Sequence, residues 1–232
     1  MEDGAQISDK KFVRQTQEYR AVLNADAYIK GLHMGISFRS FIASSSRSQD
    51  DRVVSDTMSL PSCLVRTSDL PLSALSHEFH AMVPSNERYQ LRIGDQTGLT
   101  KTGVHFCRLP PSTTSTTLHW HSHEDEWFYI LEAGENAVLL LREGGESDAE
   151  EASAETKEIR IRKGDFLGFP GGRRNAHALR SGDAELVYLM GGSREPLDVS
   201  HYPEIGKRKV TDLTGRGMTW SVEDRDVKPV KK

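Results

Sequence analysis

Three histidines occupy alternate positions in the segment LHWHSHEDEWFYIL, residues 118–131. If this stretch is a β-strand, His119 and His121 project from the same face, because successive side chains of a strand point to opposite faces. Two imidazoles on one face can share a metal ion of the kind that neutral imidazole binds, such as zinc, iron, manganese, nickel or copper. After a short turn, Glu126 opens the next strand and can add a carboxylate. Such a set leaves coordination positions open, so we predict a site for metal-assisted chemistry.

A second segment, GDFLGFPGGRRNAHALR at residues 164–180, can complete this site. The run Pro170-Gly171-Gly172 ends one strand sharply, and His177 begins another. In an antiparallel barrel that strand can lie beside the first one, where His177 would be a fourth ligand. His123 shares the alternation, but the turn begins there. It is therefore a candidate acid or base, a support for a ligand, or a residue that faces solvent.

Short strand-like segments follow one another from about residue 88, and they would position the candidate ligands. They are rich in aromatic and aliphatic residues and are separated by turns that contain Gly, Pro, Asn or Asp, a pattern typical of an antiparallel barrel or sandwich. His105 and Cys107 share one face of such a strand and either line the barrel or fill its core. The segment EGGESDAEEASAET, residues 143–156, has the composition of a solvated, poorly ordered loop. The strand-like segments are RYQLRI, TGVHFCRL, EWFYILE, NAVLLLR, EIRIRK, DFLGF and ELVYLMG.

The chain is therefore expected to have four parts. Residues 1–57 are an N-terminal extension, partly helical or disordered and loosely packed, because a weakly periodic segment is followed by a polar run. Residues 58–87 are a lead-in to the barrel. Residues 88–195 form the barrel, and residues 196–232 form a C-terminal tail that packs on it.

Composition excludes several classes of protein. The formal net charge of the 232 residues is −4, so a basic face for nucleic acid is not expected. Two cysteines give no disulfide framework and suit a reducing compartment. No apolar run has the length of a membrane span, and the start MEDGAQISDKK is unlike a secretory signal. We expect a cytoplasmic protein whose partner is a small molecule, with neither nucleic acid nor membrane as a partner.

Two motifs resemble those of the cupin superfamily: HWHSHEDEWFYILEAG resembles its first motif, and GDFLGFPGGRRNAH its second. The resemblance extends from about Leu70 to Pro203 and is nearest to the single-domain type-2 cupins of bacteria and fungi. It implies an all-β fold, a small antiparallel jelly-roll barrel, and a homodimer paired through edge strands. It also implies that a strand within residues 58–87 can exchange between the two subunits. It also implies one divalent ion (iron, manganese, zinc or nickel) bound by the superfamily's ligand set, which falls on His119, His121, Glu126 and His177.

The reaction stays open at this level, because one scaffold hosts many chemistries. The favoured interpretation is a metal-dependent enzyme that acts on a small organic molecule, in secondary metabolism or catabolism. Such an enzyme is either a dioxygenase or a lyase, decarboxylase or isomerase. Its acid or base is unassigned, with His123 as the candidate. The alternative is a non-catalytic cupin that binds a small molecule.

Overall fold

The computed structural model describes residues 60–145, 148–214, 217–228 and 230. These all belong to a single unit within residues 57–232. The expected N-terminal extension, residues 1–57, lies outside the described residues.

Antiparallel strands dominate this unit, as the alternation of apolar and polar residues predicts, and six of them form the largest sheet. Each of its six strands pairs only with antiparallel neighbours. In spatial order they are β1 (Ser76–Phe79), β2 (Glu87–Leu91), β3 (Thr102–Leu109), β10 (Leu186–Ser193), β5 (Glu126–Glu132) and β8 (Phe166–Phe169).

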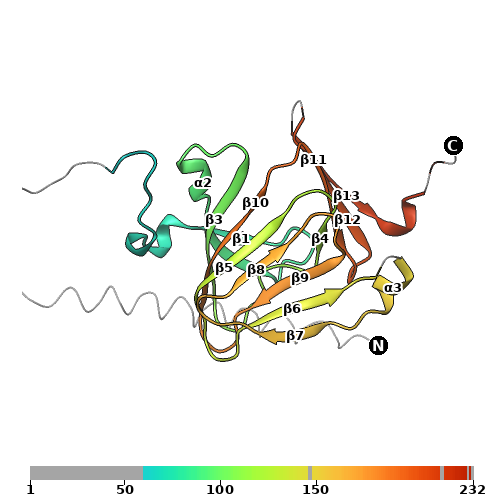
Figure 1. The fold of residues 1–232 in the computed structure, drawn as a ribbon, viewed down its shortest axis with the longest axis horizontal. Helices are drawn as coiled ribbons and strands as arrows, with labels where there is room; N and C mark the ends of the chain where they lie inside the picture. Colours follow the sequence, from blue (N-terminus) through green and yellow to red (C-terminus); the bar gives the residue numbers. More distant parts are fainter. Residues whose placement is uncertain (1–59, 146–147, 215–216, 229, 231–232) are drawn as a thin grey trace, which may run out of the picture. The chain divides into compact units, whose positions relative to one another are not determined.

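Two further sheets make up the other wall (Figure 1). A bridge between His119 and His177 connects them, so the wall is continuous at that point. The four-stranded sheet contains β13 (Met218–Glu223), β12 (Lys207–Asp212), β11 (Leu197–Tyr202) and β4 (Trp120–His121), and the three-stranded sheet contains β7 (Lys157–Arg160), β6 (Val138–Glu143) and β9 (Asn175–Arg180).

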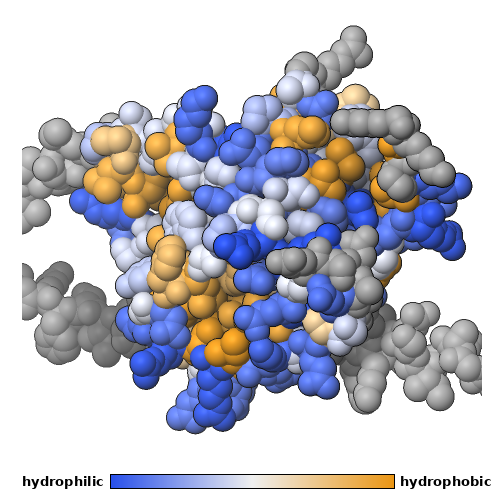
Figure 2. All heavy atoms as spheres, turned by 45° about the vertical axis from the view of Figure 1, so that its right-hand side comes forward, coloured by the Kyte–Doolittle hydropathy of each residue, from blue (hydrophilic) through white to orange (hydrophobic). Residues whose placement is uncertain are grey.

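The core fills the space between the walls, with one inward-facing residue from every second position of each strand. Its fully buried members come from β3, β5, β9 and β10 and include Leu109, Ile130, Leu179 and Tyr188. On the outside, exposed hydrophobic side chains gather in patches between charged ones on the face that Figure 2 shows.

Helices are few and short among the described residues: α2 (Ile93–Gln96), α3 (Asp148–Ser153), η2 (Thr67–Asp69), η3 (Leu72–Ala74) and η4 (Asp224–Asp226). None of them is long and apolar enough to cross a membrane. The all-β antiparallel barrel expected from the sequence is confirmed.

Helix α3 corrects the expectation of a poorly ordered loop at residues 143–156. It follows β6 and precedes β7 (Figure 1). Glu151 anchors it, because this carboxylate accepts hydrogen bonds from Trp120 Nε1 and Arg174 and is buried to 9% exposure. The prediction was wrong because it rested on the charged composition of the segment. Composition does not show that one of its acids, Glu151, has two hydrogen-bond donors on the barrel.

The segment after residue 195 contributes more than a packed tail. Its strand β11 pairs with β4, with Ser200 opposite His121. Strands β12 and β13 then extend the same sheet outward. Residues 196–232 therefore supply part of the wall that carries the histidines.

Candidate metal centre

The four residues implied as ligands come together inside the barrel. His119 directly precedes β4 and His121 is its last residue. Glu126 begins β5, and His177 lies in β9. Glu126 Oε2 is their common neighbour, at 2.9 Å from His177 Nε2, 3.4 Å from His119 Nε2 and 3.5 Å from His121 Nε2. The ligand atoms of His119, Glu126 and His177 all lie within 4.8 Å of one another. The bridge between His119 and His177 brings β9 beside β4, and the facing of the two walls brings His177 to Glu126, 51 positions away in the sequence.

The other nitrogen of each of these imidazoles has an acceptor. Nδ1 of His119 lies 3.1 Å from the carbonyl oxygen of Thr117, and Nδ1 of His177 lies 3.0 Å from that of Asn175. A carbonyl can only accept, so Nδ1 carries a hydrogen and Nε2 is the nitrogen left to bind a metal ion. His121 Nδ1 likewise has the carboxylate of Asp198 as its acceptor, so all three Nε2 atoms face the same space around Glu126.

Asp198 is a candidate functional residue that the sequence did not reveal. Its Oδ2 lies 2.7 Å from His121 Nδ1, and its Oδ1 accepts the backbone N–H groups of His123 and Glu124. The carboxylate is 2% exposed, and its charge is satisfied by these donors and by the Ser200 hydroxyl, which donates to Oδ2 at 3.5 Å. The sequence LDVSHY carries no signal for this role, because its polar residues Asp198 and Ser200 are buried while the apolar Leu197 is exposed.

Burial and mutual hydrogen bonds set the protonation of the metal-free site. Burial lowers the pKa of His119 to about 4. Burial also acts to lower the pKa of His121, but hydrogen bonds to Asp198 and Glu126 outweigh it and raise that pKa to about 10. Burial acts to raise the pKa of Glu126, yet hydrogen bonds from the three histidines hold it well below its usual range. The site therefore holds a carboxylate ready to bind a cation.

Aromatic rings enclose the ligands. Phe169 stacks on His177 with ring centroids 3.6 Å apart, and Phe128 meets the same ring edge-on at 5.6 Å. Tyr202 stacks on His119 at 5.5 Å. Trp120 faces the opposite side of β4, because it alternates with the two histidines. There it stacks on His201 at 3.7 Å.

A pocket of about 200 Å³ opens beside the ligands. His121 and Glu126 form part of its lining, together with His105, Glu124 and Arg194. His105 therefore lines the interior, one of the two roles left open by the sequence, whereas Cys107 is fully buried in the core. Burial raises the pKa of the Cys107 thiol to about 12, so it stays protonated at neutral pH.

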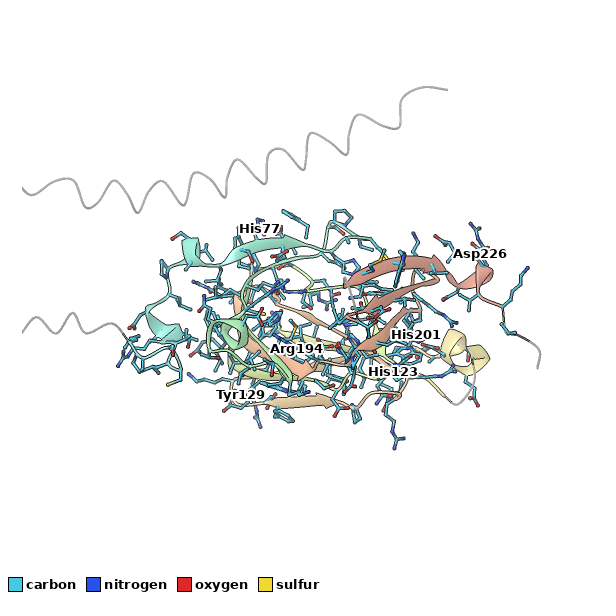
Figure 3. All side chains as sticks on the ribbon, turned by 90° about the horizontal axis from the view of Figure 1, so that it is seen from above. His77, His123, Tyr129, Arg194, His201 and Asp226 are labelled. Atoms are coloured by element: carbon cyan, nitrogen blue, oxygen red, sulfur yellow. The ribbon has the colours of Figure 1, made fainter. Side chains whose placement is uncertain are left out.

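His123 lies in the turn between β4 and β5, outside the lining of this pocket. Its side chain is 56% exposed, and its Nδ1 is 4.0 Å from Asp198 Oδ1. Figure 3 labels it near His201, whose Nε2 lies 2.8 Å from the hydroxyl of the neighbouring Ser122. The geometry favours a position at the edge of the site for this residue.

The donor set fits a divalent transition metal. Three imidazole nitrogens and one carboxylate oxygen converge, the hydrogen of each Nδ1 is already engaged, and the pocket leaves room for a further ligand. An exposed acidic cluster would show none of these features. A second group of possible ligands, His121, Glu124 and Asp198, shares His121 with the first and is part of the same centre.

Comparisons with solved structures place this arrangement in a known fold. A protein from Acidithiobacillus ferrooxidans with the provisional name sugar phosphate isomerase is 27% identical, with a TM-score of 0.60, over 74% of this chain and 98% of its own. A sugar phosphate isomerase of the cupin superfamily from Silicibacter pomeroyi is 24% identical, with a TM-score of 0.52, over 69% of this chain and 96% of its own. No family model and no curated protein matches the sequence. The structural neighbours confirm the cupin fold expected from the two motifs.

Proposed function

We propose that this cupin is a metal-dependent enzyme that acts on a small organic molecule, and that it is an isomerase of hydroxylated, anionic substrates. The observation that carries the first part is the convergence of three oriented imidazoles on Glu126 beside a pocket. The name of the Acidithiobacillus ferrooxidans neighbour supports the second part, because nearly the whole of that protein is covered at 27% identity.

His119, His121, Glu126 and His177 would hold the ion. When bound, a divalent ion at such a site polarises a carbonyl and acidifies a bound hydroxyl or water. The candidate ions are iron, manganese, zinc and nickel. Loading the protein with each ion in turn would identify the one that it binds.

The surrounding residues have their own roles. Asp198 fixes the tautomer and orientation of His121 through the 2.7 Å contact. Phe128 and Phe169 exclude water from the side of His177, which strengthens electrostatic interactions in the pocket. The pocket of about 200 Å³ is smaller than the sites that take drug-sized ligands, so it suits a compact molecule.

The support for an anionic substrate is the guanidinium of Arg194, in a pocket that also holds carboxylates. Arg194, which is paired with Asp95, and His105 line the pocket beside Met190. Glu124, Asp125 and Glu126 line it too, and Glu126 would hold the ion. A guanidinium at the rim suits a phosphate or carboxylate group. A dioxygenase and a decarboxylase remain alternatives that would use the same ligands. Oxygen uptake tests the first, and turnover of small diacids tests the second.

The metal assignment is tested by elemental analysis of the purified protein and of the His119→Ala/His121→Ala double variant. We expect about one ion per chain in the wild type and loss of it in the double variant. His77→Ala, at an exposed position in β1, is a control that should keep its metal. Equal metal content in wild type and double variant would contradict the assignment.

Turnover is tested with the loaded wild type on aldose and ketose phosphates of three to six carbons, followed by NMR. Interconversion that depends on the ion supports the proposal. The alternative, a non-catalytic small-molecule-binding cupin, is favoured if these compounds bind in the pocket and none is converted.

A further inference from the structure

Three side chains form a chain of hydrogen bonds along the inner face of β2 and β3. Arg88 Nε donates to Gln90 Oε1 at 3.0 Å, and Arg88 Nη1 donates to the carbonyl oxygen of Ser115 at 3.1 Å. His105 Nδ1 lies 3.3 Å from the same amide oxygen of Gln90. Gln90 is 4% exposed, so its amide is fixed by these partners.

This chain determines the tautomer of His105. A guanidinium has only donors, so the Gln90 atom that faces Arg88 must be the amide oxygen. That oxygen can only accept, and His105 Nδ1 must therefore carry the hydrogen. The lone pair of the neutral imidazole is left on Nε2.

His105 lines the pocket that His121 and Glu126 also line. The register puts His105 opposite Met190 on β10, and Met190 opposite Phe128 on β5. A Cβ built on Gly103, which also lines the pocket, would be 3.8 Å from His105 Nε2 and 3.7 Å from Arg194 Nε, so both nitrogens lie beside this glycine. A basic nitrogen and a guanidinium thus flank one open space.

We propose that His105 is the base that moves a proton in this pocket, and that Gln90 and Arg88 are positioning residues that present its Nε2. The inference rests on the proposed function and deepens it by assigning the group that the isomerisation requires. The substrate class is a 2-hydroxyaldehyde or 2-hydroxyketone that carries a phosphate or carboxylate, with Arg194 facing the anionic group.

The charges around His105 keep it neutral at pH 7. Burial, followed by the charges of Arg92 and Arg88, lowers the pKa of His105, and Arg194 acts in the same direction. Only Asp95 opposes them, and that carboxylate is already paired with Arg194. A neutral imidazole in a fixed tautomer is ready to accept a proton.

The step balances as a hydrogen shift without an external oxidant. His105 Nε2 takes the proton from the carbon next to the carbonyl, and the electrons of that C–H bond form a C=C bond while the carbonyl oxygen becomes a hydroxyl. The resulting imidazolium returns the proton to the former carbonyl carbon. Meanwhile the hydroxyl of the neighbouring carbon loses its proton and becomes the new carbonyl, so one proton passes between the two oxygens.

Other titratable groups are less suited to this step. His123 is largely exposed and lies outside the pocket lining, and Cys107 is fully buried. Glu124 lines the pocket, but one of its oxygens accepts the backbone N–H of Glu195 and the other lies 3.8 Å from His121 Nδ1. Among the described residues, His105 is hydrogen-bonded through Nδ1, which leaves Nε2 as an acceptor of fixed orientation in a residue that lines the pocket.

The tautomer is tested first, without any substrate. In full-length, zinc-loaded protein at pH 7, a long-range ¹H–¹⁵N spectrum of the histidine side chains should show His105 protonated at Nδ1 and bare at Nε2. The cross-peaks are assigned by their loss in His105→Gln. Gln90→Glu, which keeps an acceptor for both neighbours, should preserve this tautomer. In Gln90→Met, the Nδ1-protonated tautomer of His105 should no longer be the predominant one. A wild-type His105 protonated at Nε2 would overturn the inference.

The second measurement uses fructose 6-phosphate and ribulose 5-phosphate in D₂O, with deuterium entry at carbon and turnover read by NMR. His105→Gln should lower kcat by about 10²- to 10⁴-fold with unchanged metal content and little change in KM. Gln90→Met should lower kcat less, and Gln90→Glu should restore it. Equal exchange in wild type and His105→Gln overturns the role of His105 alone. A metal-loaded wild type that converts no aldose or ketose phosphate overturns the proposed function, and the role of His105 with it.

Discussion

His121 and Asp198 join two strands of the barrel wall through a 2.7 Å contact between Nδ1 and Oδ2. The same carboxylate accepts two backbone N–H groups from the turn after His121, at His123 and Glu124. One buried acid therefore fixes both the imidazole and the turn that leads to Glu126.

Asp198→Ala should weaken metal binding by about 10- to 100-fold, because His121 loses the acceptor that orients its ring. Competition with a chromogenic chelator measures the affinity. Asp212→Ala is the matched control, since Asp212, on β12, accepts hydrogen bonds from Thr214, away from the candidate ligands. An unchanged affinity in Asp198→Ala would show that strand pairing alone positions His121.

Glu151→Ala should release α3 from the barrel without affecting the metal. The change removes the acceptor of Trp120 and Arg174, and we expect a loss of about 1–3 kcal/mol in the free energy of unfolding. Hydrogen exchange should show faster exchange of the α3 amides. Metal affinity should stay at the wild-type value, because Trp120 faces away from the ligands. Slow α3 exchange in the variant would mean that other contacts hold the helix.

The barrel strands were predictable because their signal is local. Each of the seven quoted strand segments, such as TGVHFCRL and EWFYILE, overlaps an observed strand, since alternation and turn residues are properties of neighbouring positions. Strand β4 is only two residues long and carries no such run, yet it holds His121. The sequence predicted a C-terminal tail where strands β11 to β13 lie. Charged residues such as Lys207 and Arg208 obscure the alternation of apolar and polar residues there.

The site was predictable as a list of side chains and less so as a geometry. The spacing of His119 and His121 gave the shared face, and the motifs implied Glu126 and His177. Asp198 comes from a strand 77 residues after His121, and only tertiary pairing brings it there. The same holds for Gln90 and His105, whose contact depends on the register of β2 against β3.

Self-association is expected through the outer face of the six-stranded sheet. Phe166 on β8 is 65% exposed, stacks on Trp127 with ring centroids 6.2 Å apart, and lies opposite the exposed Tyr129 on β5. Exposed aromatic clusters of this kind mark interfaces. Sedimentation of the wild type should give a homodimer, and Phe166→Glu should give a monomer. Leu197→Glu, an exposed position on β11, is the control that should remain dimeric. A monomeric wild type at micromolar concentration contradicts the prediction.

Acid should destabilise the protein in part through His201. Burial, with the nearby charge of Arg208, lowers the pKa of His201 to about 4 from an ordinary 6.5. Between these two values the unfolded chain binds a proton that the folded chain does not, so the free energy of unfolding falls as the pH falls from 6.5 to 4. The full shift corresponds to about 3 kcal/mol, and partial exposure to solvent reduces this to about 1–2 kcal/mol.

His201→Phe removes this titration and keeps an aromatic ring to stack on Trp120. The loss of stability between pH 7 and pH 4.5, measured by urea unfolding at each pH, should therefore be smaller in this variant by about 1 kcal/mol. The variant also loses the hydrogen bond to Ser122, and this loss lowers its stability at both pH values. Comparing each variant with itself at the two pH values therefore cancels that effect. His77→Phe, at an exposed position in β1, is the matched control. If both variants change the pH dependence equally, the buried position of His201 is not its source.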